Sequence, residues 1–398
     1  MIALALNAGS STLKACLYRL VPGAPLAAPP APVWEQQVNW PVGTAGDDTA
    51  GRLLRELWHG PGAPLAGPYE IDVVGHRIVH GGTRYTSAIA IGDEVKRQIA
   101  ALAALAPLHN LAALSGIEAA ERSLVPGTPQ IAVFDTAFHA SLPAPAYTYA
   151  GPRKWVDAGL RRFGFHGINH EYVAHRTARI VNRSLDGLRL LTCHLGSGAS
   201  LAAVRHGRSV DTTMGFTPLD GLAMATRSGS IDPGLLLHLL RAGDTSPDEL
   251  YEVLNRESGL AGLSGTGGDM RDVLAARERG DAHAHLAFDV YVHRLHRCMG
   301  AMLPSLGGLD AIAFTGGVGE HSAAVRRAAL KPFRFLGVDL DDAGNDASTG
   351  DADIAKADSR VRVVVIKARE EWAVARSAAE LLTQRGPRPG AKSCSAGQ

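Results

Sequence analysis

The sequence predicts an α/β protein made of two related domains, and three observations support this fold class. The chain has 398 residues, nearly half of them hydrophobic, so it can fill a core in more than one domain. Short apolar and β-branched runs are interspersed with longer segments of helical spacing. A unit of apolar strand, Gly/Ser-rich turn and second apolar strand occurs in each half, as LNAGSSTLKACLY (6–18) and CHLGSGASLAAV (193–204). Such a repeat indicates two related domains facing a shared cleft.

The elements can be assigned in chain order from their apolar patterns. Short runs rich in Val, Ile, Leu and Ala are predicted strands: Ile2–Asn7, Leu13–Leu20, Ile71–Val79, Ile131–Phe134, Leu188–His194, Leu201–Arg205, Ala311–Phe314 and Arg360–Ile366. Segments of helical period are predicted helices: Asp93–Ala106, His170–Asn182, Asp281–Leu303 and Glu370–Thr383. Residues 21–51, rich in Pro, Ala and Gly, are predicted to form a weakly patterned connection, and the polar tail after Arg385 is predicted to be disordered.

Composition narrows the class of protein. The net charge of +1 lacks the basic excess of a nucleic-acid-binding protein. Four widely spaced cysteines are typical of buried thiols in a reducing compartment. The N-terminus has no basic region before its apolar run, and the uncharged stretch Ile99–Ile117 is interrupted by Pro107, His109 and Asn110, which favours buried core over a membrane span. We therefore expect a soluble cytoplasmic protein with no nucleic-acid or membrane partner.

Three glycine-rich turns suggest a nucleotide site. The two Gly/Ser turns of the repeat let backbone N–H groups approach phosphate oxygens, and Lys14 adds a cation beside the first of them. For one such turn alone, a plain β-hairpin is the better interpretation. The third turn, FTGGVGE (314–320), ends a predicted buried strand, where glycines allow close approach to a base or a phosphate. Together the three turns favour a nucleotide held between two domains.

Several charged residues lie where small neighbours cannot shield them. Arg77 ends a predicted strand in GHRIVHGG, and Arg227 lies in the loop GLAMATRSGSIDP. A guanidinium in such a setting commonly binds a carboxylate or a phosphate, although a structural salt bridge is the better interpretation of either arginine taken singly. Asp135 follows a strand and could accept a proton, hold magnesium or cap a turn. Glu370 and Glu371 in a first helical turn either complement the helix dipole or organise a magnesium ion.

His166 in RRFGFHGINH raises a second possibility, because His166 and His170 have the i, i+4 spacing of a zinc site. The glutamate of the H-E-x-x-H motif is missing, and Gly167 weakens the start of the helix. A zinc site is therefore not favoured.

The ordered motifs of the chain resemble those of the acetate kinases. The similarity extends from Ile2 to about Leu382. The motifs that carry it are LNAGSSTLK, GHRIVHGG, APLHN, VFDTAFH, RRFGFHG, CHLGSGASLAA, DTTMGFTPLDGL, ATRSGSIDP, DMRD, FTGGVGE and EEWAVARSA. The family belongs to a superfamily that also holds sugar kinases, heat-shock chaperones and actin. The resemblance implies a duplicated ribonuclease-H-like fold, that is, two actin-like ATPase domains around a nucleotide cleft, and a homodimer.

The resemblance also implies domain limits and an activity. One domain would comprise residues 1–136 with 371–385, and the other residues 137–370 with the nucleotide loops and the dimer interface, followed by a disordered tail at 386–398. The activity would be reversible, in-line transfer of the ATP γ-phosphoryl group to acetate, a phosphotransferase reaction with a carboxyl acceptor that yields acetyl phosphate and ADP. Mg²⁺ would be the cofactor, with Mn²⁺ as a possible substitute.

Site residues carry over motif by motif as implied roles. The implied catalytic residues are Asp135, His166, Arg227 and Arg77. Arg77 would also bind the substrate, in an acyl pocket with Val79, Leu108, His109, Phe165 and Pro218. The implied nucleotide-binding residues are Thr12, Lys14, His194, Leu195, Gly196, Ser197, Gly198, Asp269, Met270, Arg271, Gly317, Val318, Gly319, Glu320 and His321. Asn7 and Glu370 would belong to the magnesium region.

Chemical reasoning refines these implied roles. Phosphoryl transfer depends on positioning and on cationic donors, which two arginines, a histidine and Mg²⁺ supply. A carboxylate with an ordinary pKa of about 4 needs no general base, so we favour Asp135 as an organiser of magnesium or water over a proton shuttle. One methylene in an apolar pocket is worth only about 1–3 kcal/mol, so propionate should be accepted to a lesser degree.

Some positions depart from the family pattern, and rival functions remain. Ser197 and His321 stand where asparagine is usual, and Gly267 and Gly268 where serines are common, which puts nucleotide affinity and ATP-over-GTP preference in question. Within the enzyme class the alternative is a kinase that prefers propionate or butyrate. From another class, the same fold could serve as a nucleotide-gated binding module. That alternative predicts ATP turnover without stimulation by acetate.

Overall fold

The chain divides into two compact units. In this computed structural model, residues 1–9, 12–21, 29–40, 48–104 and 107–384 are described, with the backbone alone for 104 and 107–109. The first unit comprises Met1–Ala137 and the segment that begins at Arg369, and the second comprises Phe138–Ala368. The domain limits expected from the sequence remain a prediction.

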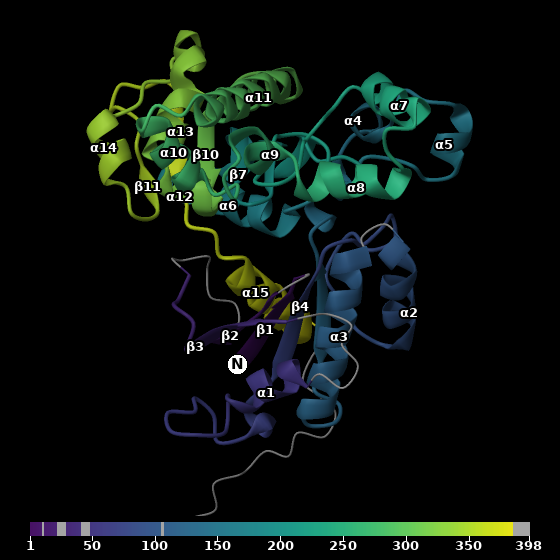
Figure 1. The fold of residues 1–398 in the computed structure, drawn as a ribbon. Coiled ribbons are helices and arrows are strands. Elements are labelled where there is room, and N and C mark those ends of the chain that lie inside the picture. Colours follow the sequence, from purple (N-terminus) through teal and green to yellow (C-terminus); the bar gives the residue numbers. More distant parts are fainter. Residues whose placement is uncertain (10–11, 22–28, 41–47, 105–106, 385–398) are drawn as a thin grey trace, which may run out of the picture. The chain divides into compact units, whose positions relative to one another are not determined.

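The first unit is built on a mixed six-stranded sheet (Figure 1). Its strand order is β3-β2-β1-β4-β6-β5. The strands are β1 (Ile2–Ala8), β2 (Thr12–Arg19), β3 (Trp34–Asn39), β4 (Val73–Ile78), β5 (Ile89–Ala90) and β6 (Gln130–Phe134). The helices are α1 (Thr49–Arg55), α2 (Asp93–Ala101), α3 (Pro107–Ser123) and α15 (Glu370–Gln384), with the 3₁₀ turns Pro68–Glu70 and Leu102–Ala104.

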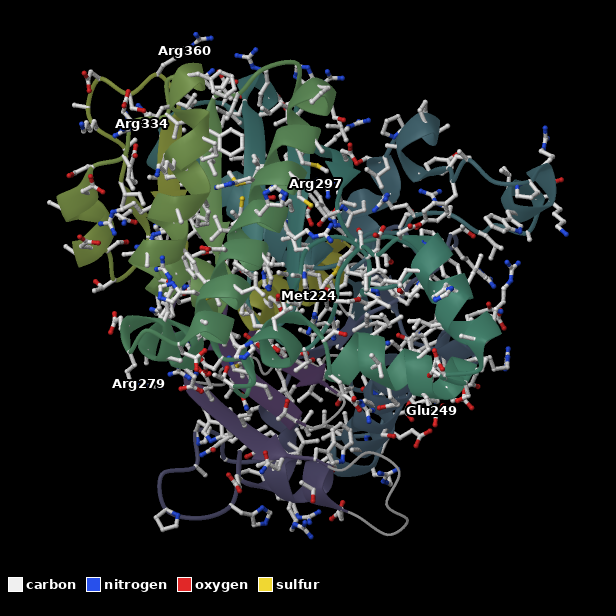
Figure 2. The ribbon with its side chains drawn as sticks, turned by 45° about the horizontal axis from the view of Figure 1, so that its top comes forward. Met224, Glu249, Arg279, Arg297, Arg334 and Arg360 are labelled. Atoms are coloured by element: carbon white, nitrogen blue, oxygen red, sulfur yellow. The ribbon has the colours of Figure 1, made fainter. Side chains whose placement is uncertain are left out.

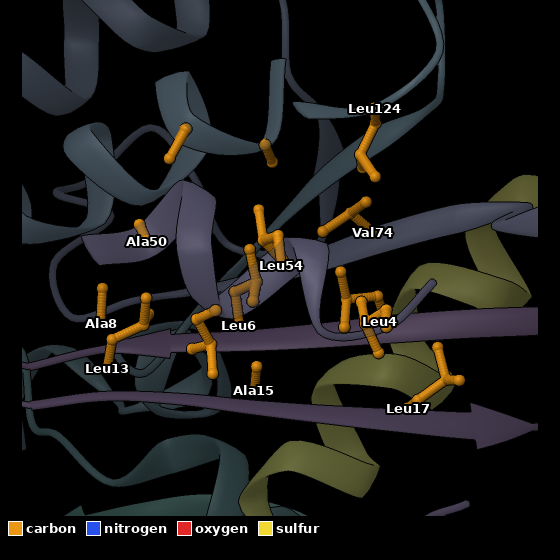
Figure 3. Packing of buried hydrophobic residues seen from close by; sticks show 14 of the residues in the cluster. Leu4, Leu6, Ala8, Leu13, Ala15, Leu17, Ala50, Leu54, Val74 and Leu124 are labelled. Carbon is orange, nitrogen blue, oxygen red and sulfur yellow. The ribbon is translucent and has the colours of Figure 1, made fainter. Parts of the chain in front are cut away.

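The core of the first unit lies where β1 and β2 meet α1 and α3. Leu4, Leu6, Leu13 and Leu17 are buried on one face of the two strands, because alternate residues of a strand point to the same side. Helix α1 covers them with leucines, Leu54 among them (Figure 3). Such side chains contribute roughly 1.5–3 kcal/mol each when fully buried, so this cluster holds the first hairpin in place.

Helix α15 packs against the same sheet at a site where only glycine fits. A Cβ at Gly75 of β4 would lie 2.8 Å from Val374 Cγ1 and 2.9 Å from the Val374 carbonyl oxygen. The missing side chain lets the helix approach the strand closely. Helix α15 thereby reaches β1 and β6 as well, and its first residues lie near the carboxyl ends of these strands.

The second unit contains another mixed six-stranded sheet, of order β11-β12-β10-β7-β8-β9. Its strands are β7 (Arg189–Leu195), β8 (Ala199–Arg205), β9 (Arg208–Thr212), β10 (Ala311–Thr315), β11 (Ala352–Asp353) and β12 (Arg362–Val365). Its helices are α4 (Ala144–Tyr147), α5 (Arg153–Asp157), α6 (Gly167–Ile180), α7 (Pro233–Ala242), α8 (Pro247–Arg256), α9 (Gly259–Ser264), α10 (Met270–Glu278), α11 (Ala282–Leu306), α12 (Gly316–His321), α13 (Ala323–Leu330) and α14 (Asp342–Ala347). The 3₁₀ turns are Ala137–Ser141, which starts at the last residue of the first unit, Leu185–Gly187 and Lys331–Leu336.

The two sheets repeat one topology strand for strand. In each, three consecutive strands form an antiparallel meander, a later strand pairs in parallel with its first strand, and one more strand pairs in parallel with that added strand. In each, a two-residue strand that precedes the last parallel strand in sequence pairs antiparallel with it at the edge. The predicted α/β duplication is therefore confirmed, and the two Gly/Ser turns are the equivalent first hairpins β1–β2 and β7–β8.

Three sequence expectations need correction. Residues 21–51 contain a strand, β3, whose side chains are mostly exposed, so it lacks the apolar alternation of a half-buried strand. The turn FTGGVGE forms the short helix α12 directly after β10, because the Glu320 side chain accepts a hydrogen bond from the Gly316 N–H and stabilises the first helical turn. The helix predicted at Asp93–Ala106 ends at Ala101, where a 3₁₀ turn follows.

The remaining predicted strands and helices occur within a few residues of their expected bounds. Strands β5, β9 and β11 and helices α1, α3–α5, α7–α10, α13 and α14 were not predicted. The tail predicted to be disordered lies outside the described residues. No helix among the described residues combines the length and apolar character that crossing a bilayer requires.

Candidate active site

The first unit carries a charged cluster at the carboxyl ends of its parallel strands. Asn7 lies near the end of β1, Arg77 near the end of β4, and Asp135 directly after β6. Parallel neighbouring strands bring these positions to one edge of the sheet. Helix α15 adds Glu370 and Glu371 from its first turn.

Arg77 is the centre of this cluster. Its Nη2 and Nε donate to Asp135 Oδ2 at 2.6 and 3.1 Å, and its Nη1 donates to Asn7 Oδ1 at 3.1 Å. Glu370 Oε2 lies 3.6 Å from Nε. Burial disfavours the charged guanidinium, but Asp135 and Glu370 outweigh that effect and raise the pKa of Arg77. The arginine therefore stays cationic while it is largely removed from water.

Asp135 is almost fully buried, with 1% of its side chain exposed. Burial, together with the nearby Glu370, raises its pKa to about 6 despite the lowering effect of Arg77. Its Oδ1 atom is buried and has no hydrogen-bond partner among the described residues. An unpartnered buried carboxylate oxygen is costly unless a ligand, a cation or water satisfies it.

Lys14 and Asn7 connect the first hairpin to helix α15. The two residues are register partners in the β1–β2 ladder. Lys14 Nζ lies 3.3 Å from Glu371 Oε2 and 3.0 Å from Glu35 Oε1, while Asn7 Nδ2 donates to Glu371 Oε1 at 3.2 Å. Burial lowers the pKa of Lys14, but the two glutamates reverse the effect and raise it. Lys14 is thus paired with acids in this structure, and its expected contact with phosphate remains a prediction.

In the second unit His166 has an unusual backbone conformation. It is the N-cap of α6 with φ 56°, a left-handed value that a side chain other than that of glycine rarely adopts. Its neighbour Phe165 is fixed, since the Phe165 carbonyl oxygen lies 3.0 Å from His139 Nε2. Strain of this kind is concentrated at functional sites. The His166 ring stacks on the ring of His194, with centroids 4.2 Å apart.

Arg227 reaches the same turn as His166. A Cβ at Gly198 would lie 3.4 Å from His166 Nε2 and 3.6 Å from Arg227 Nη1, so both side chains border the Gly/Ser turn. The guanidinium makes long contacts: Pro218 O at 3.4 Å and the sulfur of Met224, labelled in Figure 2, at 3.9 Å. Burial lowers the pKa of Arg227. A partly buried cation with such weak partners is well suited to bind an anion.

A pocket of about 670 Å³ lies beside this turn, within the second unit. Its walls come from the β7–β8 turn, the loop before α10 and the start of α12. The loop glycine Gly268, at φ 84°, has no room for a side chain, because a Cβ would lie 2.5 Å from Ala225 O. The lining residues are Gly196, Ser197, Ala225, Thr226, Leu260, Gly267, Gly268, Asp269, Met270, Arg271, Leu274, Gly317, Val318, His321 and Ser322.

The pocket brings together three segments that the sequence analysis had assigned to the nucleotide. Of the residues assigned there, His194, Leu195, Gly198, Gly319 and Glu320 do not line it. Their nucleotide role remains a prediction, as does that of Thr12 in the first unit. Ala225, Thr226, Leu260, Leu274 and Ser322 line the pocket but were not expected, because small and apolar residues carry no chemical signature. Four positions that depart from the family pattern border it, namely Ser197, Gly267, Gly268 and His321, whereas three further departures, Thr12, Lys367 and Arg369, do not.

The expected acyl pocket is divided between the two units. Val79 is buried in the first unit, whereas Phe165 is buried in the second and Pro218 is half-buried there. Leu108 and His109 begin α3, but their side chains lie outside the described residues. The acyl pocket therefore remains a prediction.

The repeated strand order defines a duplicated, ribonuclease-H-like α/β protein with a glycine-rich pocket in one unit and a buried acid–base cluster in the other. A sequence model described as "Acetokinase family" matches residues 65–376, so the chain belongs to the acetokinase family.

Relatives and solved structures agree with this membership. The acetate kinase of Gloeobacter violaceus is 52% identical over 94% of this chain and 98% of its own length. That of Trichormus variabilis is 50% identical over 96% of this chain and its full length. The crystal structure of Porphyromonas gingivalis acetate kinase superposes with a TM-score of 0.86 at 35% identity, covering 96% of this chain and 99% of that one. A propionate kinase from Francisella tularensis gives a TM-score of 0.82 at 32% identity, covering 94% and 98%.

Proposed function

We propose that the chain is an acetate kinase that transfers the γ-phosphoryl group of ATP reversibly to acetate, giving acetyl phosphate and ADP. The observation that carries this proposal is the end-to-end similarity to enzymes named acetate kinase. The geometry supports it, since each residue with an implied catalytic role lies in a setting suited to that role.

The pocket of the second unit would bind the nucleotide. A volume of about 670 Å³ lies within the roughly 300–1,000 Å³ usual for small-molecule sites. Glycine-lined walls allow the flat base and the phosphates to approach the backbone closely. Arg271 and Asp269 form an exposed ion pair at its rim, with Arg271 Nη2 and Asp269 Oδ2 2.5 Å apart, and would meet the ribose or base.

Charge stabilisation would come from Arg77, Arg227 and His166. In phosphoryl transfer, negative charge spreads over the equatorial oxygens of the moving group, and preorganised cationic donors stabilise it. Arg77 is oriented by Asp135 and Asn7, so little motion is needed to present its guanidinium. Acetate is ionised at neutral pH and attacks without losing a proton, so no residue is needed as a general base.

The residues of the first unit suit a magnesium ion. Mg²⁺ prefers oxygen ligands, and the cluster offers the carboxylates of Glu370 and Asp135 and the amide oxygen of Asn7. The buried Oδ1 of Asp135, which has no hydrogen-bond partner in the described parts of the chain, is the observation that favours this fit. When bound, Mg²⁺ would offset the charge of the phosphate oxygens. The chain's own residues would hold the substrates in line and exclude water.

Hydroxamate trapping tests the proposed function. The full chain is incubated with ATP, Mg²⁺ and millimolar acetate, and acetyl phosphate is captured with hydroxylamine. We expect acetohydroxamate in amounts that grow with enzyme and time. No product under these conditions would refute acetate kinase activity, and ATP turnover that ignores acetate would favour the nucleotide-gated binding module.

A second candidate is a kinase that prefers propionate. The superposition on a propionate kinase is nearly as good as that on an acetate kinase, so the fold does not discriminate between them. Ratios of kcat/KM for acetate, propionate and butyrate decide the matter. Acetate should lead propionate by roughly tenfold or more, because an acyl pocket sized for one methyl group excludes a second carbon at a cost of about 1–3 kcal/mol.

We also propose that the chain forms a homodimer through its second unit. Large apolar side chains are exposed on α5, α7 and α8, among them Trp155, Leu235, Leu237 and Tyr251. These helices lie together at one side of the unit (Figure 1). Exposed apolar groups of this density are typical of a protein interface. Light scattering should give twice the mass of the chain, and Leu235→Glu with Leu237→Glu should give the single mass.

Cytoplasmic location is part of the proposal. The three cysteines within the described residues, Cys16, Cys193 and Cys298, are free thiols. Free thiols, two of them buried, are what a reducing compartment maintains.

A further inference from the structure

A chain of hydrogen-bonded side chains leads from His166 into the interior of the second unit. His166 Nδ1 lies 2.9 Å from Ser200 Oγ, and the same oxygen lies 2.7 Å from His170 Nε2. His170 Nδ1 lies 2.7 Å from Thr192 Oγ1, whose hydroxyl donates to the carbonyl oxygen of Ala202 at 3.2 Å. Ser200, His170 and Thr192 have no exposed surface. We name these three residues, with His166, the relay.

We assign the one hydroxyl proton of Thr192 to its contact with the Ala202 carbonyl oxygen, which can only accept. A count of protons then gives the direction of the other bonds in the relay. Thr192 Oγ1 must then accept from His170, which places a proton on His170 Nδ1. Burial lowers the pKa of His170 well below its usual range, and His139 and His194 lower it further, so His170 is neutral and its Nε2 is bare.

The same count continues to His166. The bare Nε2 of His170 accepts the hydroxyl proton of Ser200. Ser200 has no second proton, so its oxygen can only accept from His166. His166 therefore carries a proton on Nδ1.

This proton position limits what His166 can do, if the proposed function holds. A neutral imidazole has one N–H, and with the proton on Nδ1 the other nitrogen, Nε2, presents a lone pair. A lone pair repels an anionic phosphoryl oxygen. We propose that Ser200, His170 and Thr192 are positioning residues that hold the proton of His166 on Nδ1, so that His166 donates to the phosphoryl group from Nε2 only as the imidazolium cation.

Side chains from several structural elements surround His166 and influence whether its ring is neutral or cationic. His194 of β7 stacks on the ring, Arg227 borders the same glycine, and His170 of α6 lies behind Ser200 with His139 against its far side. Asn169 Nδ2 donates to His194 Nδ1 at 2.7 Å, which leaves any proton of a neutral His194 on Nε2. Arg227 disfavours a second positive charge nearby, and an anionic phosphoryl group would offset this repulsion. The cationic form of His166 would therefore be favoured when the phosphoryl group is bound.

Thr192→Val is the decisive variant, because it keeps the shape of the side chain and removes the hydroxyl that orders the relay. Without that acceptor, His170 can place its proton on Nε2, Ser200 can donate to His166, and His166 can carry its proton on Nε2. Thr177→Val is the matched control: Thr177 is a buried threonine of α6 whose hydroxyl, within the part of the chain that the structure describes, bonds the Val173 carbonyl oxygen of its own helix, at 2.7 Å, and no relay residue. Ser200→Ala is the second relay variant, in case Thr192→Val folds poorly.

Nitrogen NMR of the histidine rings in the full chain reads the proton position directly. The His166 signals are assigned by their loss in His166→Asn, and spectra are taken at a pH where the ring is neutral. In the unmodified chain and in Thr177→Val we expect the proton on Nδ1, and in Thr192→Val on Nε2 or divided between the two nitrogens. A neutral His166 with its proton on Nε2 in the unmodified chain overturns the proposal. This measurement does not depend on activity, so it separates failure of the relay from failure of the proposed function.

The pH profile of kcat is the functional measurement. The unmodified enzyme and Thr177→Val should lose activity as pH rises and the His166 cation is neutralised. Thr192→Val should lose about tenfold in kcat at neutral pH, because a neutral donor forms a weaker hydrogen bond than a cationic one. It should also show a flatter alkaline limb with KM for both substrates little changed. An alkaline limb identical in Thr192→Val and Thr177→Val would overturn the proposed role of the relay.

Discussion

At the scale of single residues, the candidate site contains charged side chains that are costly to remove from water and whose hydrogen bonds within the described residues are long or incomplete. Among the described residues, the hydrogen-bond contacts of the Arg227 guanidinium are long ones, to a carbonyl oxygen and a sulfur. Asp135 has one carboxylate oxygen paired and the other buried without a described partner. Charged groups that serve only the stability of a protein normally have hydrogen-bond partners when they are buried. We infer that their energetic cost is offset when substrate and cation bind.

Arg227→Ala should lower kcat by roughly 10²–10³-fold while the protein remains folded. Loss of one preorganised donor to a charged transition state has about this effect. The long contacts of Arg227 contribute little to stability, so the melting temperature should change by a few degrees at most. Steady-state kinetics and circular dichroism check both statements, with exposed Arg153→Ala as the control. A normal kcat, or an unfolded variant, would contradict the assignment.

Asp135→Asn should weaken the dependence of activity on magnesium. The amide keeps the shape and can still bind Arg77 through its oxygen, but it removes the negative charge that organises a cation or water. We expect kcat to fall by about 10²-fold or more and the Mg²⁺ concentration for half-maximal activity to rise. Titration of activity with MgCl₂ measures both quantities. Unchanged magnesium dependence would show that the carboxylate serves only to position Arg77.

At the scale of elements, the fit of α15 on the first sheet depends on the missing side chain at Gly75. Helix α15 brings Glu370 and Glu371 to the ends of β1, β4 and β6, so its seat on the sheet also sets the charged cluster.

Gly75→Ala should destabilise the chain by about 1–3 kcal/mol, because an added methyl group collides with the side chain and backbone of Val374 in a packed core. Urea unfolding followed by circular dichroism measures the change. Gly300→Ala in the interior of α11 is the matched control: nothing lies within 4 Å of the added Cβ, so it should raise stability by about 0.5–1 kcal/mol. Equal effects at the two positions would refute the close-packing argument.

The sequence predicted strands and helices where burial left a clear apolar pattern, but it did not predict α3, whose buried residues are mostly alanine. The paired hairpins were found because β1, β2, β7 and β8 are almost entirely buried and read as continuous apolar runs. Strand β3 escaped because its side chains face solvent at a sheet edge, so only its backbone pairing defines it.

The site residues with chemically distinctive side chains could be predicted from the sequence, whereas the other residues of the site could not. An arginine or an aspartate at the end of a strand and beside small residues has few structural roles, so Arg77 and Asp135 could be predicted as site residues. Ala225 and Leu260 line the pocket with backbone and methyl groups. Alanine and leucine occur throughout the chain, so their residue type does not indicate a binding site. The relay behind His166 was missed for another reason: Ser200, His170 and Thr192 come from α6, β7 and β8, and only the tertiary fold brings their polar atoms together.

At the scale of the whole molecule, several buried histidines make stability depend on pH. Burial lowers the pKa of His76, His80 and His139 to about 4, against about 6.5 for the unfolded chain. Between these values the unfolded state binds more protons than the folded state, so stability is present above pH 6.5 and is lost as pH falls toward 4.

The urea midpoint should therefore be constant near pH 7–8 and fall steadily from pH 6.5 to 4.5. Unfolding curves at half-unit intervals measure it. Replacement of His139 by Gln, which keeps a hydrogen-bond donor for the Phe165 carbonyl oxygen, should reduce the slope, whereas exposed His206→Gln should not. A midpoint independent of pH across this range would contradict the buried neutral state of these rings.

The discontinuous first unit also has a consequence for biosynthesis. Its sheet is made early, but the helix that covers β1, β4 and β6 is the last described element to leave the ribosome, after the entire second unit. At a synthesis rate of roughly 5–20 residues per second, on the order of tens of seconds pass between the synthesis of this sheet and that of the helix. During that interval the strip around Gly75 has not yet received the helix that packs on it, and the charged cluster has not yet received Glu370 and Glu371. The unit whose sheet is translated first is thus the unit completed last. Its sheet lacks a covering helix until α15 has been synthesised.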